Sequence, residues 1–164
     1  MEKMIIRKNT GNEADIDAAL NIYNSNKDFL LHHIGRDSVD RGFITNELHE
    51  MKDHGFISNI VYDEENPVGV LDYMLQKDGS AYLSLMMLDF KYQKAGRGKS
   101  LFRLFENQMI NAGAKTIRID VVNDHEPNVI PFWEKMGFEG KEQQELTWGD
   151  KTSRVLVMIK NIEN

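Results

Sequence analysis

The stretch QKAGRGKS, residues Gln93 to Ser100, decides the fold because the hydrophobic pattern changes its period there. Before it, Ala81 to Phe90 reads as a strand that follows a turn at residues 77–80. After it, Gly98 to Ala112 is predicted to be a helix, with Gly113 at the position where a left-handed glycine ends many helices. The apolar stripe of this helix consists of Leu101, Phe102, Leu104, Phe105, Met109 and Ile110. The stretch is therefore a glycine loop between a strand and a helix.

The end of this loop is similar to a nucleotide-binding P-loop, because Gly98-Lys99-Ser100 satisfies the GK[ST] part of that motif. A P-loop also needs a glycine five positions before Gly98, and that position holds Gln93. The dinucleotide-binding fingerprint would need a small residue where the chain has Leu101. A nucleotide-dependent phosphotransferase is therefore the less favoured interpretation.

Length and composition predict a single domain over residues 1–164, because no linker, repeat or low-complexity tract interrupts the chain. The 41% of apolar and 28% of charged residues are an ordinary globular balance. No apolar run approaches the roughly 20 residues of a membrane span, the N-terminus lacks the apolar region of a signal peptide, and cysteine is absent. A cytoplasmic protein is expected, and the net charge of −6 disfavours nucleic-acid binding.

No catalytic metal is expected. The stretch HEMKDH from His49 to His54 is similar to the zinc pattern H-E-x-x-H but has one residue too many. In a helix the extra residue turns the second histidine about 140° away from the first. The missing cysteines also exclude thiolate metal sites and a cysteine nucleophile.

The order of predicted elements indicates an α/β (α+β) protein with about seven strands and about four helices. A strand, helix, strand crossover in the middle requires parallel pairing there, inside a mixed sheet that is otherwise mostly antiparallel. The segment Phe29 to Arg36 is ambiguous. The predicted strands are Met4–Lys8, Phe56–Tyr62, Val68–Gln76, Ala81–Phe90, Thr116–Val122, Glu142–Trp148 and Arg154–Ile162, and the predicted helices are Glu13–Asn24, Ser38–Asp53, Gly98–Ala112 and Pro127–Met136.

Two motifs carry a resemblance to a known family. The loop has Gln93, Gly96 and Gly98 at the three defining positions of the pattern [Q/R]-x-x-G-x-[G/A]. About thirty residues later, the stretch from Asn123 to Phe138, NDHEPNVIPFWEKMGF, is similar to the pattern N-x-x-N-P-x-A-x-x-[LF]-Y-E-K-x-G-F. Both motifs resemble those of the GCN5-related N-acetyltransferase (GNAT) superfamily, and the element order fits its fold along nearly all of the chain.

The resemblance implies that the chain binds acetyl-CoA and releases coenzyme A. The loop and the start of its helix would hold the pyrophosphate, because helix N-termini bind anions and glycines let the backbone approach closely. The strand before the loop would offer unpaired backbone groups to the pantetheine arm, and Asn123 and Phe132 would lie beside the cofactor. The implied cofactor-binding residues are Met86, Met87, Leu88, Gln93, Lys94, Ala95, Gly96, Arg97, Gly98, Lys99, Ser100, Asn123 and Phe132.

The chain departs from the family pattern at two positions. Most members have a tyrosine that protonates the departing thiolate, whereas this chain has Trp133, whose indole N–H cannot act as an acid at neutral pH. Glu126 stands where an asparagine is usual, at the start of the expected last helix. The general acid is therefore unknown, although a thiolate is a tolerable leaving group without one.

The general base is also unknown. Members that use a glutamate or histidine place it at positions that correspond to Tyr82 and Ser84, and neither of these side chains is a competent base at neutral pH. Asp72 and Glu47 are candidates by their chemistry alone, as are His32 and His33, and an ordered water chain is the alternative.

The resemblance implies an N-acetyltransferase that transfers an acetyl group directly to a primary amine of a small molecule or a peptide. A non-catalytic acyl-CoA-binding sensor or partner-binding module is the alternative, because the usual acid and base are missing. A homodimer is expected from the resemblance and from the apolar run Arg154 to Ile159, which would need a partner if it formed an edge strand. The same run would also suit an interior strand.

Overall fold

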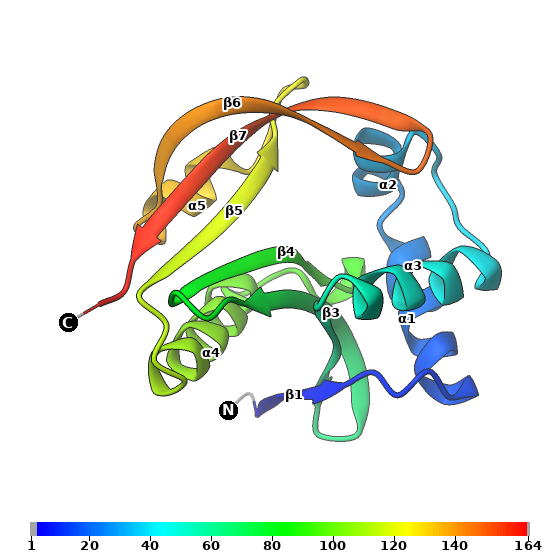
Figure 1. The fold of residues 1–164 in the computed structure, drawn as a ribbon. Coiled ribbons are helices and arrows are strands. Elements are labelled where there is room, and N and C mark those ends of the chain that lie inside the picture. Colours follow the sequence, from blue (N-terminus) through cyan, green and yellow to red (C-terminus); the bar gives the residue numbers. More distant parts are fainter. Residues whose placement is uncertain (1–2, 164) are drawn as a thin grey trace.

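The computed structural model describes residues 3–163, and its seven strands form one sheet in the order β1-β2-β3-β4-β5-β7-β6 (Figure 1). All neighbours pair antiparallel except β4 and β5, which pair parallel, as the sequence predicts. The strands are β1 (Met4–Lys8), β2 (Ile57–Asp63), β3 (Asn66–Leu75), β4 (Ser80–Leu88), β5 (Thr116–Val122), β6 (Glu139–Trp148) and β7 (Lys151–Asn161).

Helices cover both faces of the sheet and create two hydrophobic clusters. One face carries α1 (Glu13–Ser25), α2 (Lys27–Ile34) and α3 (Arg41–Asp53), which pack on β3 and β4 through residues such as Tyr23 and Leu30. The other face carries α4 (Arg97–Asn111) and α5 (Ile130–Lys135), whose apolar side chains include Phe102 and Trp133. In Figure 1, α4 lies below β4, while α1 and α3 lie to its right. Within residues 3–163, no helix is long and apolar enough to cross a membrane.

The strands β4 and β5 separate soon after they begin. They pair only from Ser80 to Tyr82 on β4 and from Thr116 to Arg118 on β5. Beyond these pairs, β5 turns toward β7 and leaves one edge of β4 without a strand partner. Figure 1 shows the two strands diverging from their shared end. We call this gap between the later halves of β4 and β5 the splay.

Two predicted helices, α3 and α5, begin about three residues later than predicted, and the ambiguous segment lies in a further helix. The segment Phe29 to Arg36, which the sequence left ambiguous, lies mostly in α2. Gly35 follows the last residue of this helix and has a left-handed backbone conformation (φ 82°). The helix α3 begins at Arg41 rather than Ser38, because the Asp40 side chain accepts a hydrogen bond from the Phe43 N–H and caps it there. The helix α5 is shorter than the predicted Pro127–Met136, because the Asn128 side chain accepts from the Ile130 N–H and holds a turn before the helix.

The apolar run near the C-terminus belongs to an interior strand. Pairing with β5 on one side and β6 on the other satisfies the backbone of β7. The edge-strand interpretation of Arg154 to Ile159 was therefore wrong, and buried residues such as Val155 and Met158 face the core. The strand at this edge of the sheet is β6, which is mostly exposed and rich in charged side chains, as is usual for edges that resist pairing.

Candidate active site

The first turn of α4 presents the backbone N–H groups of Gly98 and Lys99 at its open end. Ala95 and Gly96 both have left-handed backbone conformations (φ 63° and 73°), and α4 begins at the next residue. The first hydrogen bond back into the loop comes from the Ser100 N–H, and no side chain of residues 3–163 caps the helix at Gly96. The N–H groups of Gly98 and Lys99 therefore remain available for an anion, and the helix dipole adds to their attraction.

The two loop glycines create room for such an anion. A Cβ built at Gly96 would meet nothing within 4 Å, so the space beside this residue is open. At Gly98 a Cβ would lie 3.7 Å from the Phe132 ring, which places α5 directly beside the first turn of α4. Phe132 is therefore positioned next to the loop, as the resemblance implies.

Basic side chains surround the loop. Lys94 and Lys99 are exposed, and Arg97 lies 4.0 Å above the centre of the Tyr92 ring. The Ser100 hydroxyl donates to the Gly96 carbonyl and so stabilises the loop rather than pointing away from it. These positive charges suit the phosphate groups of coenzyme A, and the open N-terminus of α4 suits its pyrophosphate.

The edge of β4 that faces the splay presents alternate backbone groups. The Asp89 N–H donates to Val68 of β3, so the peptide groups of Met87, two residues earlier, also point toward β3. Those of Met86 and Leu88 point into the splay. Of the three residues predicted to bind the pantetheine arm, Met86 therefore offers its backbone groups and Leu88 its N–H, since the Leu88 carbonyl already accepts two side-chain hydrogen bonds. Met87 contributes a buried side chain.

Asn26, which the sequence analysis missed, connects the helices to this edge. Its buried side chain donates to the Leu88 carbonyl at 2.9 Å and accepts from the Gln93 side chain. Gln93 donates to the same carbonyl at 3.0 Å, and the Ser25 hydroxyl accepts from the Phe90 N–H. Because these partners lie more than 60 residues away in the chain, no local pattern could reveal this role.

Asn123 lies at the end of β5, on the other side of the splay. Its backbone N–H donates to the Arg154 carbonyl, and its side-chain oxygen accepts from the Arg154 guanidinium. The Asn123 side chain is therefore held by β7.

Trp133 is part of the core rather than a group that projects into the site. It is 8% exposed and makes edge-to-face contacts with Phe102, Phe132 and Phe138 at centroid distances of 4.9 to 5.5 Å. This packing joins α5 to α4 and thereby positions Phe132 beside the loop.

The two suggested carboxylate bases line one small cavity between α1, α3 and the sheet. The cavity of about 10 Å³ has room for about one water molecule. Asp72 is 1% exposed, and its Oδ1 has no hydrogen-bond partner among residues 3–163. Burial raises the pKa of Asp72 to about 7, partly opposed by hydrogen bonds from Ser58 and the Asn59 N–H. Burial also raises the pKa of Glu47, which accepts a hydrogen bond from Trp148.

The two positions where other family members place a base are occupied by bonded side chains. The Tyr82 hydroxyl donates to Asp120 at 2.8 Å, and burial next to this carboxylate raises its pKa well above the ordinary range. Ser84 lies at a bulge in β4, and its hydroxyl donates to the Asp72 carbonyl. Neither side chain is free to accept a proton at neutral pH.

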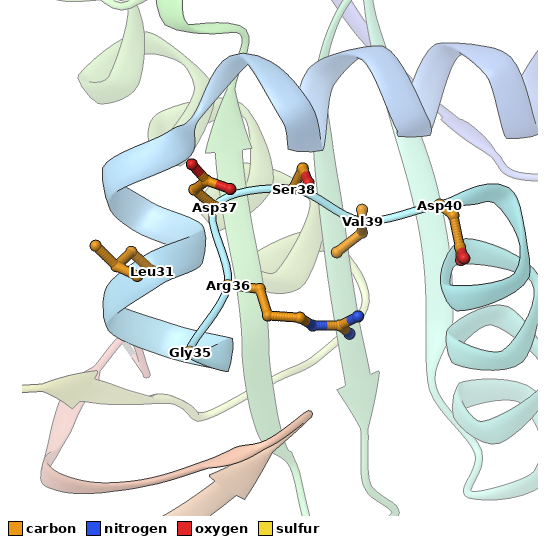
Figure 2. Close-up of a pocket in the computed structure, with 7 residues that line it drawn as sticks. All are labelled: Leu31, Gly35, Arg36, Asp37, Ser38, Val39 and Asp40. Carbon is orange, nitrogen blue, oxygen red and sulfur yellow. The ribbon is translucent and has the colours of Figure 1, made fainter.

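A hollow of about 530 Å³ lies along the connection between α2 and α3. Figure 2 shows its lining, with Arg36 extending toward α3 and Asp40 at the start of that helix. Arg36 pairs with Asp150 and lies over the Phe43 ring, while Asp40 caps α3. These charged groups already have structural partners, and no residue of the cofactor loop lines the hollow.

Comparisons with known proteins identify a family for the sequence. Residues 18–138 match the sequence profile described as Acetyltransferase (GNAT) family. A search of curated proteins found no matching sequence.

Solved structures match over nearly the whole chain. An acetyltransferase from Thermus thermophilus is 18% identical with a TM-score of 0.76, and the match covers 99% of this chain and 100% of that one. The ribosomal-protein-S18-alanine N-acetyltransferase from Escherichia coli is 15% identical (TM-score 0.72; coverage 99% and 96%). An aminoglycoside 6'-N-acetyltransferase solved with coenzyme A is 16% identical (TM-score 0.71; coverage 98% of each chain). At these identities the likeness establishes a shared fold.

Proposed function

Because this chain belongs to the acetyltransferase (GNAT) family, we propose that it transfers the acetyl group of acetyl-CoA directly to the nitrogen of a primary amine. The observation that carries the proposal is the uncapped N-terminus of α4, with open space at Gly96, beside the free edge of β4. Two separate parts of one cofactor, an anionic pyrophosphate and an amide-bearing arm, have matching sites there.

Different residues of the chain would bind the different parts of acetyl-CoA. The N–H groups at the start of α4 hold the pyrophosphate, with Lys94 and Lys99 nearby. The backbone groups of Met86 would orient the pantetheine arm, and the backbone N–H of Leu88 would polarise the thioester carbonyl. When bound, acetyl-CoA supplies an activated acyl group, and the main task of the protein is to position the amine against it.

Direct attack by the amine is favoured over an acyl-enzyme. The chain has no cysteine, and the two serines considered from the sequence, Ser84 and Ser100, donate their hydroxyl protons to backbone carbonyls. Neither serine has a base beside it that would activate it as a nucleophile.

Calorimetric titration with acetyl-CoA, coenzyme A and ATP, followed by a thiol-release assay over a panel of amines, tests the proposal. The panel includes spermidine, an aminoglycoside, phosphinothricin and a peptide with N-terminal alanine, since structural neighbours are named for such acceptors. We expect micromolar affinity for acetyl-CoA, no binding of ATP, and amine-dependent thiol release.

The buried Trp133 at the usual acid position is the observation that favours the alternative, a non-catalytic acyl-CoA-binding module. Binding of acetyl-CoA without thiol release for any amine would support that alternative. Binding of ATP in place of acetyl-CoA would contradict both and favour a phosphotransferase.

The homodimer and the choice between a small-molecule and a peptide acceptor also remain proposals. The resemblance supports the dimer, but β7 no longer does, because it is an interior strand.

A further inference from the structure

We propose that His125, oriented by Asp124 and stacked on His32, accepts the proton that the acceptor amine must lose. The inference rests on the proposed acetyltransfer and adds the missing base to it. His125 follows β5 by three residues and lies within the second sequence motif, where it was not considered as a base. The cluster around it, called the histidine cluster below, consists of His32, His33, Asp124, His125 and Lys151.

The helix α2 bridges the splay and brings this cluster to it. At its N-terminal end, Asn26 is bonded to the Leu88 carbonyl of β4. At its C-terminal end, the His32 ring stacks on His125 with a centroid distance of 3.7 Å and an interplanar angle of 6°. The Lys151 ammonium also donates to the His32 carbonyl, which fixes this end of α2 to β7. One side of the splay therefore carries the cofactor-binding edge, and the other carries His125.

Leu88 on β4 and Asp124 after β5 are equally far along the chain from the last pair of residues that joins the two strands. The last paired residues are Tyr82 and Arg118, and both Leu88 and Asp124 lie six residues beyond their paired residue. Asp124 and His125 therefore follow the end of β5 at about the chain level at which β4 ends, with a bulge at Ser84 in β4. No other histidine of the described chain reaches this level from β5, and His49 and His54 lie on or after α3.

Asp124 sets which ring nitrogen of His125 accepts the proton. Its Oδ1 lies 3.3 Å from the Nδ1 of His125, and its Oδ2 lies 2.8 Å from the Lys151 ammonium. The hydrogen bond from Lys151 lowers the pKa of Asp124, so the carboxylate remains charged and the neutral ring keeps its proton on Nδ1. The Nε2 of His125 then has a free lone pair, since no residue within 3–163 is hydrogen-bonded to it.

His125 would take one proton from the bound ammonium group, and the freed nitrogen lone pair forms the new C–N bond. The C–S bond then breaks, and its electron pair leaves with the thiolate. The second proton on the attacking nitrogen passes to solvent or to the thiolate, and His125 returns its own proton to solvent. The chain neither gains nor loses atoms, and no oxidant or further reactant is needed.

The other titratable groups that face His125 cannot take its place. Burial lowers the pKa of His33 to about 4, and its Nδ1 is bonded to the Phe29 carbonyl. The Lys151 ammonium already donates hydrogen bonds to Asp124, to Ser153 and to the His32 carbonyl. Asp72 pairs with Leu85, three residues before Leu88, and is therefore about 10 Å from the end of β4. His32 supports the ring of His125 by stacking and is a positioning residue.

His125→Ala is the direct kinetic test, measured with the fastest amine of the panel. We expect kcat/KM to fall by about 10²-fold or more, the acidic limb of its pH profile to disappear, and added imidazole to restore part of the rate. The affinity for acetyl-CoA, measured by calorimetry, should change less than threefold. His54→Ala, on an exposed histidine after α3, is the matched control and should leave all these values unchanged.

His32→Phe separates the two stacked histidines. It keeps an aromatic ring against His125, so we expect a loss in kcat/KM of less than tenfold with the acidic limb preserved. If His32→Phe abolishes the limb while His125→Ala preserves it, the assignment to His125 is wrong. If His125→Ala retains wild-type kcat/KM, the base lies elsewhere although the acetyltransfer itself stands. If the wild-type protein acetylates no amine, the proposed acetyltransferase function is contradicted, and the role of His125 as its base is contradicted with it.

The tautomer of His125 gives a readout that does not depend on activity. In ¹⁵N spectra of the wild-type protein above pH 8, we expect the ring proton on Nδ1, and in Asp124→Ala a shift of the population toward Nε2–H. A wild-type ring with its proton on Nε2 would leave no lone pair for the amine and would overturn the proposal.

Discussion

Burial determines the chemistry that is open to the side chains of Trp133 and Asp72. Trp133 fills the place of the family's tyrosine but packs among three aromatic rings of the core. Asp72 is a carboxyl group without full hydrogen bonding in a small cavity. The residue types at both positions were visible in the sequence, but their burial depends on helices that lie far away in the chain.

Trp133→Phe should retain most of the acetyltransferase activity, because the indole cannot act as an acid and the smaller ring still packs on Phe102. We expect a loss of stability of about 1 to 3 kcal/mol from the reduced core volume. Trp133→Tyr should likewise leave kcat close to the wild-type value, because the side chain at this position lies in the core and does not project into the site. Steady-state kinetics with urea unfolding checks both variants. A fall in kcat of more than tenfold for the phenylalanine variant, with KM unchanged, would contradict this account.

Asp72→Asn should stabilise the protein at pH 8 but much less at pH 4. The pKa of Asp72 is about 7 in the folded protein and near 3.8 when unfolded. Between these values the folded state binds more protons than the unfolded state, so this group makes stability fall as pH rises from about 4 to 7. Asparagine mimics the protonated form and removes that loss. Urea unfolding at several pH values gives the free energy of unfolding of the wild type and of Asp72→Asn. If the difference between these two free energies does not vary with pH, the effect of burial on Asp72 is contradicted.

Among the elements, α2 shows best why sequence alone was insufficient. The long amphipathic helix α4 and the strand β5 were predicted nearly to the residue, because an apolar stripe and a β-branched run are local patterns. The eight residues of α2 are too few for a clear period, and the helix is fixed by hydrogen bonds to Leu88 and by Lys151. The cofactor loop could likewise be found from its glycines, whereas Asn26 and His125 depend on tertiary contacts.

Asn26→Ala should weaken binding of acetyl-CoA by about tenfold or more. The substitution removes hydrogen bonds to Leu88 and Gln93, each contributing about 1 kcal/mol to the position of the cofactor-binding edge. Asn24→Ala is the matched control, since Asn24 makes two comparable bonds to the Val39 backbone away from the loop. Calorimetry on both folded variants should show a loss of affinity only for Asn26→Ala. Equal affinities for the two would show that α2 does not support the cofactor site.

At the scale of the whole molecule, the sheet has two outer strands, β1 and β6, and a gap between β4 and β5. The fold, its single parallel pair and the loop before α4 followed from sequence, while the interior position of β7 did not, because an apolar run suits an edge paired with a partner as well as an interior strand.

The homodimer implied by the family resemblance stays a prediction, and light scattering across micromolar concentrations tests it. The expected mass is about twice the 19.0 kDa of one chain. A mass that stays at 19.0 kDa would contradict the dimer without affecting the proposed cofactor site, whose residues are all argued from one chain.

The central claim is that the first turn of α4 binds acetyl-CoA, and calorimetry with the Gly96→Glu variant tests it most directly. Gly113→Glu is the matched control, because both glycines have left-handed backbone and open space around a Cβ, but Gly113 follows the opposite end of the same helix. Each substitution should cost about 1 to 2 kcal/mol of stability from backbone strain. The account predicts that Gly96→Glu abolishes binding of acetyl-CoA, because its carboxylate repels the pyrophosphate, while Gly113→Glu binds as the wild type does. Unchanged affinity in a folded Gly96→Glu variant would contradict the claim.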